Sequence, residues 1–250
     1  MDRLITEVTR NNDIEQLIRT LQKGHTAAVA GLTESMTSIL ACRALEAGRR
    51  VLVISANDLK AVRMADDIRQ IAPESIACLP GGEIDLTRAA GSLESSWRRL
   101  EALYDVMTGK ASVLSASVEA LMQRMGDPRA FRESMLTVHQ GDILPLEPLS
   151  GRLVRMGYER VNMVEGKGQF SIRGSILDIY PPALATAVRI EFFDDQVDSL
   201  RTFDCISQRS LEKPDSVTII PATEILFTRE EQAAGTDSGS ACTARRGTAT

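Results

Sequence analysis

Several features are scarce in this 250-residue sequence, and each absence excludes a class of protein. The four cysteines form no C-x-x-C pair, so the sequence predicts neither a zinc site nor a disulfide framework, and a reducing cytoplasm fits best. The two histidines, His25 and His139, are isolated and have no nucleophile beside them in the sequence. No apolar run approaches the roughly 18 residues that a membrane span needs, and the first ten residues lack the apolar core of a signal peptide.

The charge balance limits the choice of function further. The formal net charge is -5 and the sequence pI is about 5.3. These values argue against a dedicated binder of nucleic acid or of a membrane surface, because phosphate contacts require a concentration of lysine and arginine. The hydrophobic content of 43% is sufficient for a packed core, and the length suits one large domain or two ordinary ones. We therefore expect a globular protein without membrane contact.

The ten residues GLTESMTSIL, which begin at Gly31, have the frame of a phosphate-binding loop without its chemistry. In a G-x-x-x-x-G-K-[ST] loop, glycines let backbone N–H groups surround the phosphate, a lysine neutralises it and a hydroxyl reaches the metal. Here Met36 stands at the second glycine position, Thr37 stands at the lysine position, and only Ser38 is retained at the end. Glu34 adds a carboxylate that would compete with phosphate for the helix N-terminus. We expect this loop to bind no nucleotide.

The first part of the chain, residues 1–126, alternates short β-rich runs with amphipathic helical stretches, which is typical of a parallel α/β sheet. Strands are expected at TAAVAG, RRVLVISA, SIACLPGG and the start of ASVLSASVEALMQRM. Helices are expected at SILACRALEAG, which Gly48 ends, at NDLKAVRMADDIRQIA, which an Asn-Asp cap begins, and at LESSWRRLEALYDVMTG. The expected fold is a P-loop-NTPase-like α/β domain with a degenerate nucleotide loop.

From residue 127 onward the pattern changes, and a second, smaller domain is expected at 127–211. Its first 31 residues predict one strand and one helix, and the runs YERVNMV, QFSIRG, SILDIYPP, AVRIEFF and QVDSLRTFD alternate with period two, which favours an antiparallel sheet. The domain is therefore predicted to be α+β. Residues 212–228 contain one more strand, which is expected to return to the first sheet, and residues 229–250 are small, polar and expected to be disordered.

Motifs in this second domain resemble a known family. GYERVNMVEGKGQFSIRGSILDIYPP and VRIEFFDDQVDSLRTFDCISQRSLE resemble the amino-terminal, UvrB-like part of the bacterial transcription-repair coupling factor (Mfd). The resemblance covers about residues 10–227 and depends on the GY-x-R pair, the GQF-S-x-RG hairpin and the RIEFF-x-D-x-VDS-x-R meander. The altered loop suits this family, whose first domain looks like that of the excision-repair helicase UvrB with its nucleotide chemistry lost.

The resemblance implies a non-catalytic adaptor that docks UvrA, the damage-recognition ATPase of nucleotide excision repair. Arg160 and Arg173 lie on short elements beside turns, where a guanidinium can reach a partner carboxylate with two parallel hydrogen bonds. Tyr158 and Phe170 are expected to add apolar contact area. Where the UvrB pattern has Arg-x-Arg-Gly, Ser171 replaces the first arginine. ATP, magnesium, RNA polymerase and DNA are expected to bind only to downstream domains of the family, so no cofactor is expected for this chain.

Two other interpretations remain open at this point. The chain could be a divergent fragment of a UvrB-like ATP-dependent DNA helicase, an excinuclease subunit, that holds nucleotide through backbone N–H groups alone. Against this, the span where UvrB carries an aromatic-rich hairpin is short here and holds one aromatic residue, Trp97. The chain could also be a truncated, partly folded product. Asp194, Asp195 and Asp198 are expected to form a solvated face rather than a metal site.

Overall fold

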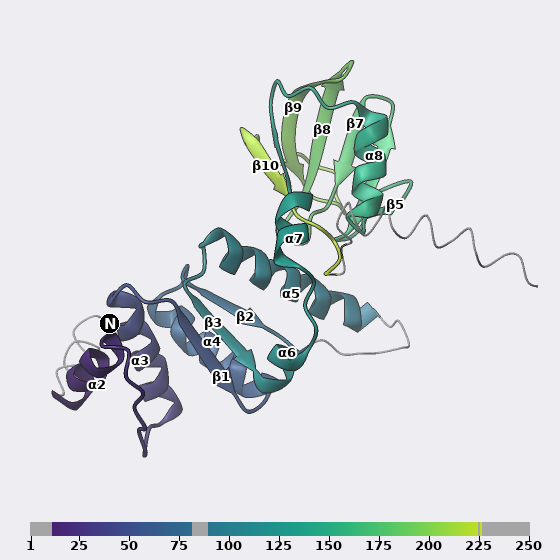
Figure 1. The fold of residues 1–250 in the computed structure, drawn as a ribbon. Helices are drawn as coiled ribbons and strands as arrows, with labels where there is room; N and C mark the ends of the chain where they lie inside the picture. Colours follow the sequence, from purple (N-terminus) through teal and green to yellow (C-terminus); the bar gives the residue numbers. More distant parts are fainter. Residues whose placement is uncertain (1–11, 82–89, 225, 227–250) are drawn as a thin grey trace, which may run out of the picture. The chain divides into compact units, whose positions relative to one another are not determined.

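The computed structural model describes residues 12–81, 90–224 and 226 (Figure 1). The chain divides into two compact units between Arg124 and Met125, and each unit is described by itself. The boundary expected from the sequence lies two residues further on, between residues 126 and 127. In the described residues, no helix is long enough and apolar enough to cross a membrane.

The first unit is built on a parallel sheet with helices that alternate with its strands along the chain, as the sequence predicted. The strand order is β1-β3-β2, with β1 (Val51–Ser55), β2 (Ile76–Leu79) and β3 (Val113–Ser117). The helices are α2 (Asn12–Gln22), α3 (Glu34–Glu46), α4 (Asp58–Ile71), α5 (Ala90–Thr108) and α6 (Val118–Met122). Side chains from α3, α4 and the strands, including Cys42, Ile68 and Val113, form one apolar core cluster.

Two helix ends predicted in this unit are confirmed, the start of α4 at Asn57 and the end of α3 before Gly48. The Asn57 side chain accepts a hydrogen bond from Lys60 N at 3.0 Å and so begins α4. The Ser117 side chain does the same for α6. Gly48 follows α3 with a φ of 75°, a left-handed conformation that glycine adopts without steric cost. Local sequence signals therefore determine where these helices start and stop.

Two expectations for the first unit differ from the structure. The strand expected at TAAVAG is wrong, since residues 25–30 have no regular secondary structure and are exposed. Three of the six residues in that run are alanine, which has low strand propensity and little apolar area to bury, so the local drive toward pairing is weak. Helix α2 was not predicted, although Ile14, Leu17, Ile18 and Leu21 have the spacing of an amphipathic helix.

Strand β1 stands at the edge of the described sheet. Its large side chains Leu52 and Ile54 are 51% and 56% exposed. An edge strand with exposed apolar side chains offers unpaired backbone groups and a hydrophobic surface together.

The second unit contains a five-stranded sheet in the order β5-β6-β7-β8-β9, which is antiparallel except between β5 and β6 (Figure 1). Its strands are β5 (Glu159–Arg160), β6 (Gln169–Arg173), β7 (Ile176–Ile179), β8 (Ala187–Phe193) and β9 (Gln196–Phe203). The predicted antiparallel sheet is therefore confirmed. A separate two-stranded sheet joins β4 (Leu136–His139) to β10 (Ser216–Ile219).

Two details of this unit also differ from the expectations. The segment from residue 127 forms two helices rather than one, α7 (Pro128–Ser134) and α8 (Leu146–Arg155). Asp127 caps α7, and the proline after it supplies a backbone angle suited to the first helical position. The expected strand near residue 216 exists, but β10 pairs with β4 in the second unit and not with the parallel sheet. Strand identity is a local property, whereas the choice of partner depends on distant residues.

One face of the large sheet is buried along the strands, and the other face is only partly covered, with Ala187 and Phe203 buried in an apolar cluster at one end. Along β8, Val188, Ile190 and Phe192 are buried, whereas Arg189, Glu191 and Phe193 are more accessible, and Ala187 at the start of the strand is buried as well. Neighbouring residues of a strand point to opposite faces, so Arg189 and the residues that pair with it define a second surface. We call this surface the open face, and it carries the candidate site.

Candidate partner-binding face

A buried carboxylate organises the open face. Asp178 on β7 pairs in register with Arg189 on β8, and its side chain is 2% exposed. Arg189 donates from Nε to Asp178 Oδ1 at 2.7 Å and from Nη2 to Oδ2 at 2.9 Å, while Arg173 Nη2 donates to Oδ2 at 2.7 Å. One carboxylate thus holds two guanidinium groups, and the three charges sum to +1.

Arg189 is the inner member of this cluster. Its Nη2 also donates to Gln208 Oε1 at 3.3 Å, and its guanidinium carbon lies 4.8 Å from the centroid of the Phe203 ring. The hydrogen bond to Asp178 raises the pKa of Arg189, so the group stays charged. These contacts fix Asp178 from the side opposite Arg173. Arg189 therefore acts as a positioning residue.

Arg173 is the outer member of the cluster, with 49% of its side chain exposed. It is the last residue of β6 and pairs with Ile176 across a two-residue hairpin whose first turn residue, Gly174, has a φ of 61°. A guanidinium has five N–H donors, and the bond to Asp178 uses one of them. Arg173 is thus anchored at one nitrogen while its guanidinium can still donate to a partner carboxylate.

A second ion pair lies beside this cluster on the same face. Arg201 on β9 pairs in register with Arg189, and its Nη2 donates to Glu191 Oε2 at 3.0 Å. Ser199 Oγ donates to the same oxygen at 2.7 Å. The charge of Arg201 is therefore balanced within the sheet, so the excess positive charge of the face lies at Arg173.

Arg160, the other arginine predicted to bind a partner, is exposed on β5. It pairs with Phe170, and bridge partners point to the same face of a sheet. Phe170 and Arg173 are three residues apart on β6, so their side chains start from opposite faces. The structure therefore does not bring Arg160 and Arg173 together on one face, although both are accessible.

The two predicted aromatic contacts lie in the core, and this corrects the expectation that they offer apolar area to a partner. Tyr158 and Phe170 are both buried. The Tyr158 hydroxyl donates to Ile220 O at 2.6 Å, and burial raises the pKa of this phenol well above its usual value. These rings support the sheet from inside. Ser171 is also buried, and its hydroxyl donates to Asn162 O at 2.9 Å.

The segment that resembles a phosphate loop forms the start of helix α3. Several of its polar groups form hydrogen bonds within the segment itself. The Thr33 side chain accepts from Met36 N at 3.2 Å, and Thr37 Oγ1 donates to Thr33 O at 3.1 Å. Ser38 is buried, and its hydroxyl contacts Glu34 O and Met64 Sδ rather than solvent. The hydroxyl that would reach a metal therefore points into the packed side of the helix.

Two charges complete the surroundings of this segment. Glu34 lies 3.5 Å from Lys60, and both side chains are about half exposed, so the carboxylate stays near the helix N-terminus. Gly31 has a φ of 79° and marks the bend before the helix. Lys60 is thus paired with the carboxylate that disfavours a phosphate.

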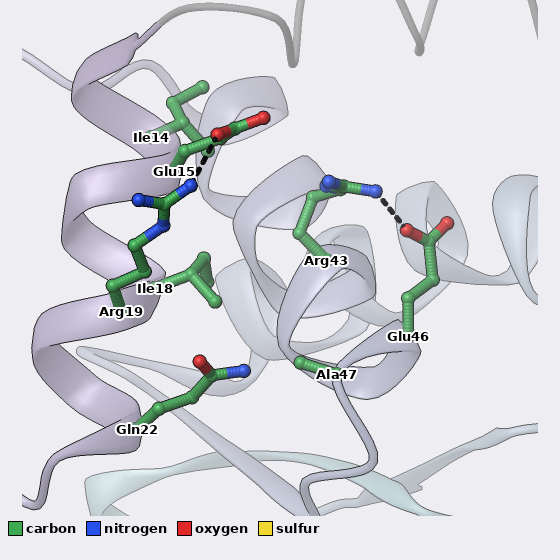
Figure 2. Close-up of a pocket in the computed structure, with 8 residues that line it drawn as sticks. All are labelled: Ile14, Glu15, Ile18, Arg19, Gln22, Arg43, Glu46 and Ala47. Atoms are coloured by element: carbon green, nitrogen blue, oxygen red, sulfur yellow. Dashed lines mark hydrogen bonds and ion pairs between the residues drawn. The ribbon is translucent and has the colours of Figure 1, made fainter.

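A hollow of about 260 Å³ lies between α2 and α3 (Figure 2). Ile14 and Ile18 project toward it from α2. Its charged groups are paired within their own helices, as Glu15 with Arg19 at 3.3 Å and as Arg43 with Glu46. The hollow therefore presents no charged group directed at a ligand.

Sequence reasoning found Arg173 but missed Asp178 and Arg189, which hold it in place. The alternation in LDI and VRIEFF shows that both residues lie on strands. Their contact depends on the register between β7 and β8, which no local pattern specifies. The prediction therefore lacked the strand register, which depends on residues that are far apart in the sequence.

Comparisons with known proteins identify the relatives of the chain. Residues 136–225 match the family model of the UvrB interaction domain. The chain is 33% identical over 237 residues to the transcription-repair-coupling factor of Bacillus subtilis, across 93% of this chain and 20% of that protein. It is 31% identical over 208 residues to the corresponding factor of Escherichia coli, across 82% of this chain and 18% of that protein.

A second group of relatives consists of UvrB proteins, with which the motifs were also compared. The UvrABC system protein B of Thermosipho africanus is 30% identical over 235 residues, across 87% of this chain and 35% of that protein. The resemblance to the UvrB-like region of transcription-repair coupling factors is therefore confirmed. The chain spans only 18 to 35% of the length of these three relatives.

Proposed function

We propose that this relative of transcription-repair-coupling factors and UvrB is a non-catalytic adaptor region that recruits UvrA in transcription-coupled nucleotide excision repair. The observation that carries the proposal is Arg173, which is half exposed on the open face and held by the buried Asp178. The residue lies inside the segment that matches the UvrB interaction domain. A preoriented guanidinium next to a turn suits bidentate recognition of a partner carboxylate.

The test is capture of purified UvrA by the chain and by charge-reversal variants. Arg173→Glu should weaken capture by about thirtyfold or more, because reversing an interfacial charge costs several kcal/mol. Arg160→Glu should also weaken it. Arg132→Glu is the matched control, since Arg132 is an exposed arginine on α7 of the same unit. Undiminished capture by both Arg173→Glu and Arg160→Glu would refute the proposal.

The first unit, in this proposal, is a P-loop-like scaffold whose nucleotide loop has degenerated. The inward hydroxyl of Ser38 and the Glu34–Lys60 pair support this interpretation. The competing function is a helicase fragment that still binds ATP. Titration with a fluorescent ATP analogue and a turnover assay separate the two, because an active site would lose both signals in Ser38→Ala. We expect neither binding nor turnover in the unaltered chain.

Other activities of the relatives belong, in this proposal, to parts of a longer parent protein. ATP and magnesium would serve a motor outside these 250 residues, and RNA polymerase and DNA would be reached through such domains. The modest coverage of the relatives supports this division. The chain itself would then contribute only the UvrA contact.

A further inference from the structure

The end of the β8–β9 hairpin carries an exposed apolar row. Phe193 pairs with Gln196 across the hairpin, and Ile143 forms an isolated antiparallel bridge with the same Gln196. Because bridge partners point to one face, the three side chains form a row across adjacent segments. Phe193 is 77% exposed and Ile143 is 74% exposed. Phe193 and Ile143 flank Gln196, and exposed large apolar side chains on adjacent segments are typical of an interaction site.

Hydrogen bonds fix the backbone beneath this row. The loop that carries Ile143 is joined to the hairpin by three backbone bonds of 2.7 to 2.8 Å, namely Gly141 N to Val197 O, Val197 N to Asp142 O and Leu144 N to Asp195 O. Two glutamine side chains add further bonds, Gln196 Nε2 to Gly141 O at 3.2 Å and Gln140 Nε2 to Asp198 O at 2.7 Å. A partner would therefore meet a surface that needs little ordering on binding.

The charged side chains of the two segments that build the row are acidic. The two segments that build it, HQGDIL from residue 139 and FDDQVD from residue 193, contain four aspartates, one histidine and neither lysine nor arginine. The Asp142 carboxylate accepts from His139 N at 2.7 Å, and Asp194, Asp195 and Asp198 are exposed. A partner surface that combines apolar and basic side chains is complementary to this pattern.

The row continues the open face on which Arg173 lies. Arg173 on β6 pairs in register with Ile176 on β7, and Ile176 pairs in register with Glu191 on β8. The register shifts between Glu191 and Phe192, but Ile190 and Phe192 are both buried, so Glu191 and Phe193 lie together on the other face. With strands about 4.8 Å apart and a rise of about 3.3 Å per residue, the Cα atoms of Arg173 and Phe193 are roughly 12 Å apart. One partner can contact both.

We propose that the docking face extends from Arg173 to the row of Phe193, Gln196 and Ile143, and that UvrA contributes there an apolar side chain flanked by lysine or arginine. This inference rests on the proposed function. It adds the chemistry of the partner surface, namely basic and apolar groups that meet the hairpin end, whose Phe193 Cα lies roughly 12 Å from the Cα of Arg173. The aspartates and Arg173 then give the face two charge signs, which defines one orientation of the partner.

The experiment measures the Kd of purified UvrA for the unaltered chain, a Phe193→Ser/Ile143→Ser double variant and an Ile206→Ser control. Ile206 is also an exposed isoleucine, and it follows the other end of β9. The double variant should bind about tenfold more weakly, as expected for loss of apolar anchors, and the control should bind as the unaltered chain does. An Asp194→Asn/Asp195→Asn variant should associate more slowly and with a weaker dependence on salt.

The outcomes separate this inference from the function on which it rests. Unaltered affinity in the double variant, together with strong loss in Arg173→Glu, overturns the inference and leaves the proposed function standing. Unaltered affinity in both Arg173→Glu and Arg160→Glu refutes the proposed function itself. Sedimentation that shows dimers of the unaltered chain and monomers of the double variant would assign the row to a second copy of this chain, and it would also overturn the inference.

Discussion

At the scale of single residues, the second unit depends on Asp178. This carboxylate is buried and accepts three hydrogen bonds from two arginines. Its removal would leave Arg189 and Arg173 close together without a counter-charge, and a half-broken buried ion pair costs more than an absent one. Asp178 is therefore both a structural residue and the support of the proposed contact.

We expect Asp178→Asn to lower the free energy of unfolding by about 3 kcal/mol, since the amide keeps the size of the side chain but loses its charge. Chemical denaturation monitored by circular dichroism gives this value. Asp215→Asn removes an exposed carboxylate of the same unit and should change stability by less than about 0.5 kcal/mol. Equal effects of the two substitutions would contradict the central role of Asp178.

At the scale of elements, the β6–β7 hairpin determines where Arg173 points. Gly174 directly follows Arg173 and has a φ of 61°, and a Cβ added there would meet nothing within 4 Å. The requirement for glycine is therefore conformational rather than a matter of space. A left-handed backbone costs other residues about 1 to 2 kcal/mol.

Gly174→Ala should accordingly lower the free energy of unfolding by about 1 kcal/mol and weaken UvrA capture, because the turn holds Arg173 in place. Gly166→Ala is the control, since Gly166 also has open space around it but no left-handed φ. Thermal unfolding and the capture assay are measured on both variants. Equal stability of the two would show that the turn tolerates a side chain.

The helices and strands also show how much of the structure could be predicted from the sequence. Helices α3, α4 and α5 and the strands of both large sheets follow from periodicity, caps and turn residues, which are local. The pairing of β10 with β4 was not predictable in this way, because it depends on residues distant in sequence. The strand expected at TAAVAG was wrong for a local reason, the low strand propensity of its alanines. The candidate site divides likewise: the RG turn identified Arg173, whereas Asp178 and the buried state of Tyr158 required the register.

At the scale of the whole molecule, two units of different construction share one chain. The parallel sheet of the first unit and the antiparallel sheet of the second each have a core of their own, with Val113 in one and Phe203 in the other. Substitutions in one unit should therefore leave the contacts within the other intact. The assays above can use first-unit variants as further controls.

The outer edge of β1, which pairs with no strand among the described residues, has a practical consequence for handling the purified polypeptide. Leu52 and Ile54 lie on the edge strand of the described sheet. Exposed apolar side chains on an edge strand favour aggregation of the protein at high concentration. Ile54→Lys should raise the concentration at which turbidity appears, because a lysine on an outer strand opposes stacking, while Lys60→Ile should not. If light scattering shows no increase in that concentration, aggregation begins at another part of the protein surface. If it does, preparations for crystallisation or spectroscopy would benefit from this one added charge.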